Sequence, residues 1–404
     1  MRRGTNSHAL GGFNKTVILD IIRRAPDGVS RVEIAQQTGL SAQTVSNVSR
    51  RLLNDSLIQE AGQQFVGVGK PRTILRLVPS GGYSIGVHID PAVFTYVVLD
   101  LGGRLVAHTS TARPDDVDAG MRESIEAIIV ASGVDRDRLL GVGIASPGPV
   151  DLERGLVLDP PLLPGWHGGA LRESLAEATG LPVLLEKDVT AAAVAELWTS
   201  HDHERDDFVL FYYGTGVGVG LALGHEVVRG STSNSGDAGH IIVDPDGPRC
   251  SCGRRGCLGD AIMPRALVEL AIERGAIESP GRALDTELVD DCFARLAALA
   301  DDGDPVSSGI LDQTARRIAV AIVTIVSLLD LDCVVLGGPY WTPASRFLLE
   351  RLPTLINSSS ALITTHPVTV TQSAIGDDLA AVGAACLVLD NALSPRASTL
   401  VISV

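Results

Sequence analysis

Residues 236–240, Gly-Asp-Ala-Gly-His, and residues 250–257, Cys-Ser-Cys-Gly-Arg-Arg-Gly-Cys, are the most distinctive stretch of this 404-residue chain. Three of the six cysteines fall in the second segment, and a histidine precedes them. Thiolate and imidazole are the ligands that a tetrahedral Zn²⁺ prefers, and three Cys with one His complete a structural site. The spacing therefore predicts a structural zinc ion bound by His240, Cys250, Cys252 and Cys257. The alternative is a set of free or disulfide-bonded cysteines.

Composition places the chain among globular proteins. Hydrophobic residues make up 45% and charged residues 20% of the sequence, which is ordinary for a folded core. No apolar run reaches the roughly 18 residues that a membrane span needs, and residues 1–10 lack the apolar region of a signal peptide. We expect a cytoplasmic protein that does not contact membranes. We expect the other three cysteines, Cys292, Cys333 and Cys386, to be buried thiols rather than disulfides.

Charge is divided unevenly along the chain. Residues 1–78 hold 11 Lys and Arg against 5 Asp and Glu, whereas the remaining residues hold 22 against 43. An acidic body would repel nucleic acid, and a basic segment attached to it is typical of a DNA-binding module.

Residues 1–78 have the periodicity of a small helical domain. Apolar residues at helical spacing stop before Pro26, and Ser30 with Glu33 predicts a capped second helix that ends at Gly39. Ser41 can cap a third helix, whose outer face carries amides, hydroxyls and guanidinium groups. These groups read base edges in the major groove and grip phosphates.

A predicted hairpin follows these helices. Strands expected at 64–68 and 73–78 flank a glycine-rich basic tip, which suits a wing that touches the DNA backbone or minor groove. The segment therefore predicts a winged helix-turn-helix; the alternative is a small helical protein-interaction domain. The predicted DNA-binding residues are Arg31, Ser41, Gln43, Thr44, Asn47, Arg50, Arg51, Lys70 and Arg72.

Beyond a linker at 79–82, strands alternate with helices, which predicts a mainly parallel sheet covered by helices. Three-strand meanders near 83–111 and 208–229 suggest two lobes with a cleft between them. Further strands are expected at 140–144, 183–186, 333–336 and 368–372. Helices are expected at 119–132, 168–179, 189–198, 265–274, 286–300, 308–329, 342–352 and 378–389, the last rich in small residues that suit close packing.

Ligand sites in such sheets lie where strands end. This rule points to residues 146–149 and 186–188. Asp188 follows an apolar strand and precedes an Ala-rich helix, so it is either a general base or a helix cap. The alternating glycines of residues 214–220 would let the backbone approach a phosphate or sugar.

Taken together, these motifs make the chain resemble the ROK family (repressors, open reading frames, kinases) over nearly all of its length. The metal-binding pattern, Ser146-Pro-Gly-Pro-Val-Asp151, Leu163-Pro-Gly-Trp166, the glycines of 214–220 and Ala381-Val-Gly-Ala-Ala385 are similar to family segments. Ser30-Arg31-Val-Glu-Ile-Ala35 and Gly69-Lys-Pro71 resemble the DNA-binding part of the repressor branch. The kinase branch lacks that module.

The sequence departs from the family's kinases at the ATP site. Kinases carry Asp-x-Gly-Gly-Thr on the first hairpin, where this chain has His88-Ile-Asp-Pro-Ala92. Pro91 and the Asp90 side chain would occupy the space of a phosphate, and an ionised Asp90 would repel it. We therefore expect no ATP use and no enzymatic activity, although Asp188 matches the family's catalytic base.

The sugar site departs as well. Residues that the family uses to bind sugar hydroxyls are replaced at Leu162, Lys187, Asp237 and Gly259, whereas Asp188 and His240 remain. A site that loses hydrogen-bonding groups should reject the usual hexose. Lys187 would either meet an anion such as a sugar phosphate or pair with Asp188 or Asp237. The predicted effector-binding residues are Lys187, Asp188, Asp237 and His240.

The resemblance implies an α/β protein with an N-terminal winged helix-turn-helix and a two-lobed, actin-like (ribonuclease H-like) ROK body. The expected domains are 1–78 for DNA binding, 82–198 plus 372–392 for the first lobe, and 199–371 for the second, zinc-containing and oligomerising lobe. We expect a homodimeric or homotetrameric regulator, most simply a repressor of carbohydrate-related genes. It would bind a double-stranded DNA operator and a sugar or sugar-phosphate effector. The alternatives are a carbohydrate kinase with an appended DNA-binding module and an effector-independent regulator.

Overall fold

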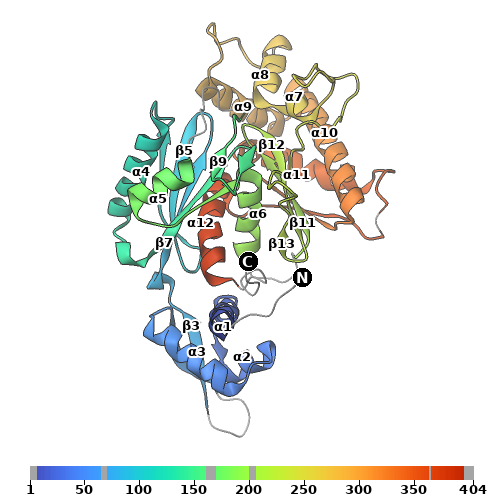
Figure 1. The fold of residues 1–404 in the computed structure, drawn as a ribbon. Coiled ribbons are helices and arrows are strands. Elements are labelled where there is room, and N and C mark those ends of the chain that lie inside the picture. The colour runs from blue at the N-terminus through green and yellow to red at the C-terminus, as the bar shows by residue number, and fades with distance from the viewer. Residues whose placement is uncertain (1–6, 65–70, 161–169, 200–205, 364, 395–404) are drawn as a thin grey trace.

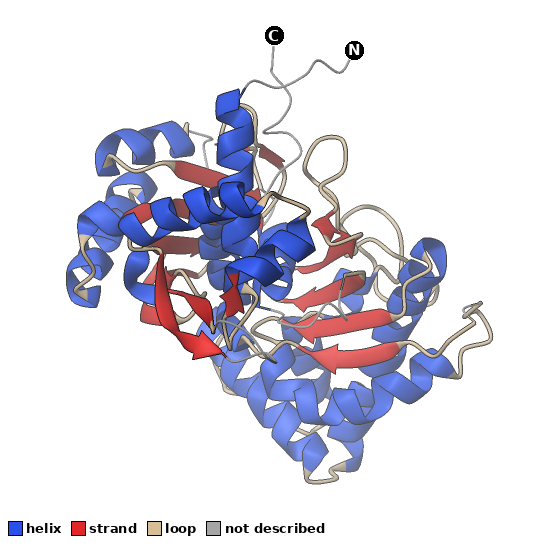
Figure 2. Cartoon of the chain, turned by 90° about the horizontal axis from the view of Figure 1, so that it is seen from below, coloured by secondary structure: helices blue, strands red, loops and turns tan. Residues whose placement is uncertain are grey.

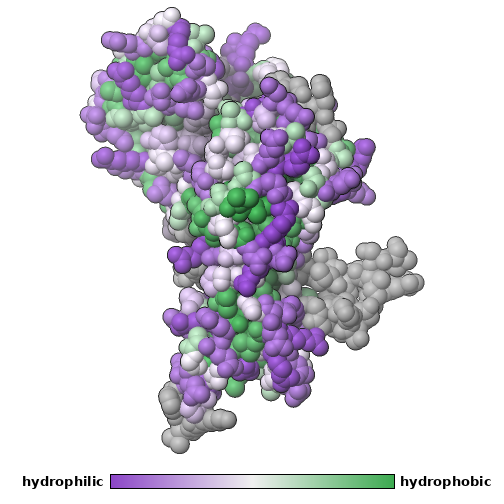
Figure 3. Space-filling view, turned by 90° about the vertical axis from the view of Figure 1, so that its left-hand side faces the viewer, coloured by the Kyte–Doolittle hydropathy of each residue, from purple (hydrophilic) through white to green (hydrophobic). Residues whose placement is uncertain are grey.

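The computed structural model describes residues 7–64, 71–160, 170–199, 206–363 and 365–394 (Figure 1). Over these ranges the chain forms a small N-terminal domain and a larger body with two five-stranded sheets. The N-terminal domain is a narrower extension below the body (Figure 3). No helix among the described residues combines the length and apolarity that a membrane crossing requires.

The N-terminal domain contains the predicted helix-turn-helix. The side chain of Ser30 and that of Glu33 form the reciprocal capping box, Gly39 ends the helix with φ +68°, and the Ser41 side chain accepts from the Thr44 amide. These caps confirm the predicted helix starts because capping depends on local sequence alone. The elements are α1 (Ser7–Arg23), β1 (Val29–Ser30), α2 (Arg31–Thr38), α3 (Ala42–Asn54), β2 (Ile58–Gln64) and β3 (Arg72–Leu77).

The first wing strand begins earlier than predicted. β2 begins at Ile58, directly after α3, because Ser56 adopts φ +56° and reverses the chain, so that Ile58 pairs with Leu77. Only Ile58 of this strand is buried, so no alternation of apolar and polar residues marks the strand in the sequence. Residues 65–70, which include most of the predicted first strand and Lys70, lie outside the described residues, whereas Arg72 begins β3.

The first sheet of the body has the order β10-β7-β4-β5-β6. The three strands of the first meander are antiparallel, and β7 and β10 continue the sheet in parallel. Its parts are β4 (Tyr83–Ile89), β5 (Val93–Asp100), β6 (Leu105–Ala112), α4 (Val117–Ser132), β7 (Leu139–Ser146), α5 (Leu171–Thr179) and β10 (Val183–Lys187), with a small ladder of β8 (Val150–Asp151) and β9 (Leu156–Val157).

The second sheet has the order β13-β12-β11-β14-β15. Figure 2 shows strands of the body flanked by helices. The strands are β11 (Phe208–Tyr213), β12 (Val217–Leu223), β13 (Glu226–Val227), β14 (Cys333–Gly337) and β15 (Thr369–Gln372). The helices are α7 (Leu258–Ile262), α8 (Pro264–Glu273), α9 (Thr286–Asp301), α10 (Pro305–Leu329) and α11 (Trp341–Asn357).

Two helices lie side by side between the sheets: α6 (Asp188–Thr199) and α12 (Leu379–Leu393) (Figure 1). α12 packs on β4 and β7, whereas α6 packs mainly on β12. The packing is close because glycines face backbone: a Cβ at Gly86 would overlap the Ala381 carbonyl, and one at Gly383 would overlap that of Ala191. The predicted close packing of the small-residue helix is confirmed.

One predicted helix is longer than expected, and one short helix was not predicted. The helix expected at 342–352 runs on to Asn357 with Pro353 inside it, because Leu352 and Ile356 are buried and continue its apolar face. α7 was not predicted, since its five residues are too few to show a helical period. The three cysteines expected to be buried thiols, Cys292, Cys333 and Cys386, are buried and form no disulfide bond among the described residues.

Candidate metal centre and interlobe cleft

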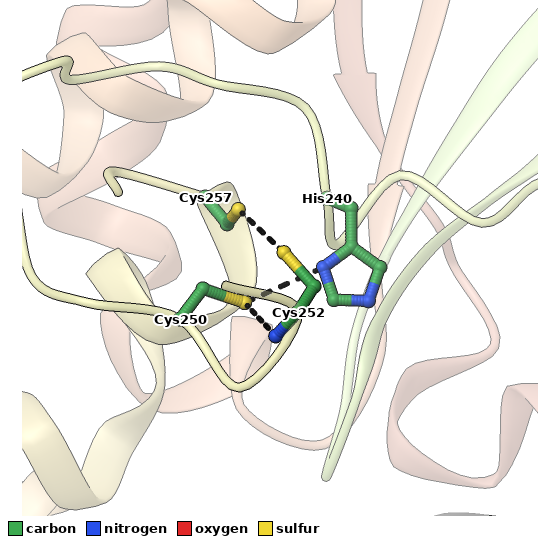
Figure 4. Close-up of side chains that lie close together, drawn as sticks. All are labelled: His240, Cys250, Cys252 and Cys257. Atoms are coloured by element: carbon green, nitrogen blue, oxygen red, sulfur yellow. Dashed lines mark hydrogen bonds between the residues drawn. The ribbon is translucent and has the colours of Figure 1, made fainter. Parts of the chain in front are cut away.

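The four predicted metal ligands converge on one point (Figure 4). One ligand atom from each of His240, Cys250, Cys252 and Cys257 lies within 4.8 Å of every other. The Sγ atoms of Cys252 and Cys257 are 3.6 Å apart, and Cys250 Sγ is 3.5 Å from His240 Nδ1. Two sulfurs that each lie about 2.3 Å from a tetrahedral zinc ion are about 3.8 Å apart. The arrangement therefore fits a metal ion.

Glycines make this loop possible. Gly253 and Gly256 both have positive φ, +88° and +67°, and a Cβ at Gly256 would overlap the carbonyl oxygen of Asp244. Isolated antiparallel bridges join Arg249 to Arg255 and Ile242 to Cys257, which brings the cysteines together.

Arg317 of α10 holds the loop in place. Its guanidinium donates to Asp244 Oδ2 at 2.7 Å and to the Ala261 carbonyl at 2.7 Å. This role could not be predicted, because Arg317 lies 73 residues from Asp244. Within the loop, the Arg254 backbone amide lowers the pKa of Cys252, whereas burial raises that of Cys257.

A cleft of about 520 Å³ separates the lobes beside the metal centre. The predicted effector residues, Lys187, Asp188, Asp237 and His240, all line it. Residues 147–149, which follow β7, line it too, and Lys187 ends β10. The rule that sites lie at strand ends therefore located the cleft correctly. His240 belongs to both the metal cluster and the cleft wall, so a bound metal would shape the cleft.

Lys187 does not pair with either aspartate. Its ammonium donates to the carbonyl oxygens of Asn234, at 3.3 Å, and Ser235, at 3.0 Å. Of the two alternatives for Lys187, the pairing with Asp188 or Asp237 is therefore excluded. Carbonyl oxygens of a second-lobe loop, residues 234–235, accept the hydrogen bonds of its ammonium instead. Lys187 joins the end of β10 to that loop.

Asp188 lies at the first position of α6 and borders the cleft. Its Oδ1 accepts a hydrogen bond from the Val189 amide at 2.7 Å, at the start of α6, while the side chain borders the cleft. Burial raises the pKa of this carboxyl, although His88, the Val189 amide and Lys187 act in the opposite direction. The site thus places a carboxyl group with weakened acidity where a ligand hydroxyl could meet it.

Asp90 bonds across the lobes. Its Oδ2 accepts from the Thr215 hydroxyl at 2.7 Å, and its Oδ1 accepts from the Ala92 amide at 3.1 Å. His88, two residues earlier, is buried, and burial lowers the pKa of its imidazole. The turn that follows β4 is therefore joined to the turn before β12. The role of Thr215 was not predicted.

The glycines of residues 214–220 also have a packing role, which was not predicted. β12 begins at Val217, so Gly218 and Gly220 lie inside the strand and face α6: their Cβ atoms would lie 2.7 Å from Val189 Cγ1 and 2.5 Å from the Val189 carbonyl oxygen. These glycines allow α6 to pack on the second sheet. Gly216 and Gly218 also border the cleft.

Asn234 makes a second joint between the lobes. Its Oδ1 accepts from the Val150 amide at 2.7 Å, and its Nδ2 donates to the Val150 carbonyl at 2.8 Å. The two residues are 84 positions apart, so no local pattern could have identified the pair.

The predicted DNA-binding residues are placed on α2, α3 and β3. Gln43, Asn47, Arg50 and Arg51 are exposed on α3, and Gln43 donates to Asn47 at 3.1 Å. Ser41 and Thr44 form the N-cap. Two predicted contacts are engaged within the domain, since Arg31 pairs with Glu60 at 2.9 Å and Arg72 lies 4.0 Å from Glu33.

A winged helix-turn-helix followed by a two-lobed, actin-like α/β body defines the architecture of a ROK-type transcriptional regulator. The model of the ROK family matches residues 84–391, and the chain belongs to this family.

Proteins similar along nearly the whole chain are named as regulators. The xylose repressor of Bacillus subtilis (strain 168) is 24% identical over 390 residues, which cover 94% of this chain and 95% of that protein. The DNA-binding transcriptional dual regulator NagC of Escherichia coli K12 is 25% identical over 366 residues, 89% of this chain and 88% of NagC.

Solved structures match either nearly the whole chain or about three quarters of it. A ROK family transcriptional regulator described as a homologue of the E. coli MLC protein has a TM-score of 0.78 and 25% identity, and the match covers 95% of this chain and 97% of that one. The ROK hexokinase from Thermus thermophilus has a TM-score of 0.60 and 29% identity, over 97% of its own chain but 75% of this one.

Proposed function

We propose that the chain is a DNA-binding transcriptional regulator, a repressor of carbohydrate-related genes, whose affinity for a double-stranded operator depends on a sugar or sugar phosphate bound between the lobes. The observation that carries this proposal is the union, in one chain, of a winged helix and a ROK body whose ATP-site turns are bonded to each other by Asp90 and Thr215. The similarity to named repressors over both parts of the chain supports it.

The same bond argues against catalysis. In the kinase branch the first hairpin presents glycine backbone to ATP phosphates, whereas here Pro91 and a carboxylate stand there. A phosphate would have to displace the Thr215 hydroxyl from Asp90 and then meet its negative charge, which costs free energy in a partly dehydrated site. We infer that the body retains the kinase fold without the kinase reaction.

The effector site would consist of Lys187, Asp188, Asp237 and His240. Carboxylates accept hydrogen bonds from hydroxyl groups, so Asp188 and Asp237 suit a polyhydroxylated ligand. Lys187 would hold the second-lobe loop and offer its remaining hydrogen to an oxygen of the ligand. A ligand that bonds to both lobes favours one lobe spacing over another, and this difference is what a regulator requires.

The metal would be structural zinc. Three thiolates and one imidazole leave no open coordination position, so the ion would supply rigidity rather than chemistry. His240, Cys250, Cys252 and Cys257 would hold it, and His240 would carry its effect to the cleft wall.

The active form would be a homodimer or homotetramer. Two recognition helices dock in successive major grooves when the half-sites lie about one helical turn apart. An effector that changes the separation of two winged helices would therefore weaken operator binding.

Selection of bound duplexes from a random pool, with and without sugars and sugar phosphates, tests the proposal. We expect a palindromic site whose affinity falls on addition of one compound. A palindrome indifferent to every compound would favour an effector-independent regulator. No enriched site, together with ATP-dependent phosphorylation of a sugar at ordinary kinase rates, would favour the kinase alternative and refute the proposal.

A further inference from the structure

The DNA-binding domain is attached to the first lobe through the chain itself. β3 leads through a 3₁₀ turn, Pro79–Gly81, into β4. This short connection is fixed, since the Leu101 amide donates to the Pro79 carbonyl at 3.0 Å and Arg138 donates to the Ser80 carbonyl at 2.7 Å. The predicted linker therefore holds the domain against the first sheet.

A second attachment joins α1 to the end of α6. Arg23 donates to the Trp198 carbonyl at 3.0 Å, and its guanidinium lies 3.8 Å above the centre of the Trp198 ring. The Arg23 side chain is 5% exposed, and Asp20 holds it at 2.9 Å. Loss of these contacts would leave a buried charge without partners, which is costly. The Arg23 contacts therefore hold α1 in a fixed position against the end of α6.

A third contact reaches the turn between β12 and β13. Arg24 Nη2 lies 2.6 Å from His225 Nε2, and His225 Nδ1 lies 2.8 Å from Asp206 Oδ1. The chain of contacts is consistent with a neutral His225 that donates to Asp206 and accepts from Arg24. Asp20 also pairs with Arg24 at 2.9 Å, so one carboxylate holds both arginines.

These contacts connect to the cleft along two routes. α6 begins at Asp188 in the cleft and ends one residue after Trp198, on which Arg23 stacks. Beside it, Arg229 pairs with Glu186 at 2.6 Å, one residue before Lys187. Arg229 also lines a cavity of about 570 Å³ between α1 and the body, together with Arg23, Arg24, Trp198 and His225. α6 therefore borders the cleft at its first residue, Asp188, and the cavity beside α1 near its last turn, at Trp198.

We propose that Arg23 and Arg24 form an anchor, here called the α1 anchor, through which the spacing of the lobes sets the orientation of the DNA-binding domain. The connection at Pro79–Gly81 ties the domain to the first lobe, and the α1 anchor ties it to α6 and the second sheet. A change in the angle between the lobes must then turn the domain or break the anchor. This proposal rests on the proposed function, and it explains how a ligand in the interlobe cleft would affect the DNA-binding domain.

Binding at coupled sites is reciprocal, so operator DNA must alter the cleft as much as an effector alters DNA affinity. Amide hydrogen exchange of the full chain, free and saturated with the duplex selected from the random pool, measures this without a known effector. We expect the duplex to slow exchange several-fold at the start of α6 and in the turn that contains Thr215, far from the DNA.

Arg24→Ala and His225→Ala should abolish most of this distant slowing while the duplex still binds. Both residues are partly exposed, so these variants should fold even if Arg23→Ala does not. Lys15→Ala is the matched control, because Lys15 lies on the same helix but pairs with Asp55 inside the DNA-binding domain. It should keep the wild-type response.

The outcomes separate the two proposals. Failure of the wild type to bind any duplex would refute the proposed function. Duplex binding with unchanged exchange at the cleft would refute the anchor alone. The same would follow from an equally large response in Arg24→Ala and the wild type.

Discussion

Asp90 Oδ2 accepts a hydrogen bond of 2.7 Å from the hydroxyl of Thr215, and the two residues lie 125 positions apart on turns of different lobes. Asp90→Ala removes this joint. A hydrogen bond to a charged group contributes about 1.5–3 kcal/mol when buried; at this partly buried site we expect a loss of about 1 kcal/mol in the free energy of unfolding. Urea denaturation measures it.

Thr95→Val is the control for that measurement. Thr95 contacts the Ser110 hydroxyl at 3.4 Å within the first sheet and on the surface, so its loss should leave stability nearly unchanged. Equal effects of the two substitutions would contradict a role for Asp90 in holding the lobes together.

The sequence predicted what local chemistry determines. The caps at Ser30 and Ser41 and the small residues of α12 act within a few positions or through close approach of backbone, so their residue types were informative. The cleft was located because strand ends in parallel sheets gather ligands.

The interlobe contacts could not be predicted. Thr215 and Asn234 have ordinary polar side chains whose partners are distant in sequence, and nothing local marks them. The partners of Lys187 could not be predicted for the same reason. Its ammonium donates to backbone carbonyls rather than to Asp188 because residues 234–235 of the second lobe lie close to it. The start of β2 was missed because an exposed strand need not alternate.

Cys252→Ser should abolish metal binding. The serine hydroxyl is a poor zinc ligand at neutral pH, and a site with three ligands no longer encloses the ion. Because a metal that binds only the folded state stabilises it, we expect the melting temperature to fall by several degrees. Metal content by elemental analysis and thermal denaturation measure the two effects.

Ser251→Ala controls for disturbance of the loop, because Ser251 lies between two ligands without being one. It should retain a stoichiometric metal ion. A wild-type protein that contains no metal, and whose melting temperature is unaffected by a chelator, would exclude the site.

Arg50→Ala and Arg51→Ala should each weaken operator binding. An arginine that contacts a phosphate contributes about 0.9 to the slope of log affinity against log salt concentration, whereas one that reads a base should cost about 1–3 kcal/mol and relax specificity at one position. Fluorescence anisotropy over a series of salt concentrations distinguishes these roles.

Arg31→Ala should weaken binding less, because its guanidinium already pairs with Glu60. Arg265→Ala, on α8 of the body, should have no effect on DNA affinity. If neither α3 arginine changes the affinity, the proposed docking of α3 in the major groove is wrong.

Asp188→Asn should make the protein more stable at neutral pH. Burial raises the pKa of Asp188 in the folded state, so ionisation destabilises the fold as pH rises from the ordinary carboxyl pKa of about 3.9 through the raised value. The asparagine avoids this cost. Its advantage should therefore be present above that interval and should shrink as pH falls below it. Urea midpoints at several pH values measure the difference.

Glu126→Gln should change the stability at neutral pH in the opposite direction. The Arg136 guanidinium lowers the pKa of Glu126, so its contribution to stability is present above the ordinary carboxyl pKa and is lost in acid. Glu126→Gln should therefore destabilise at neutral pH, by a small amount because the pair is exposed. If Asp188→Asn instead destabilised the protein at neutral pH and lost this effect in acid, as expected for Glu126→Gln, the surroundings of Asp188 would favour its ionised form. The proposal that Asp188 is a carboxyl group of weakened acidity that meets a ligand hydroxyl would then be wrong.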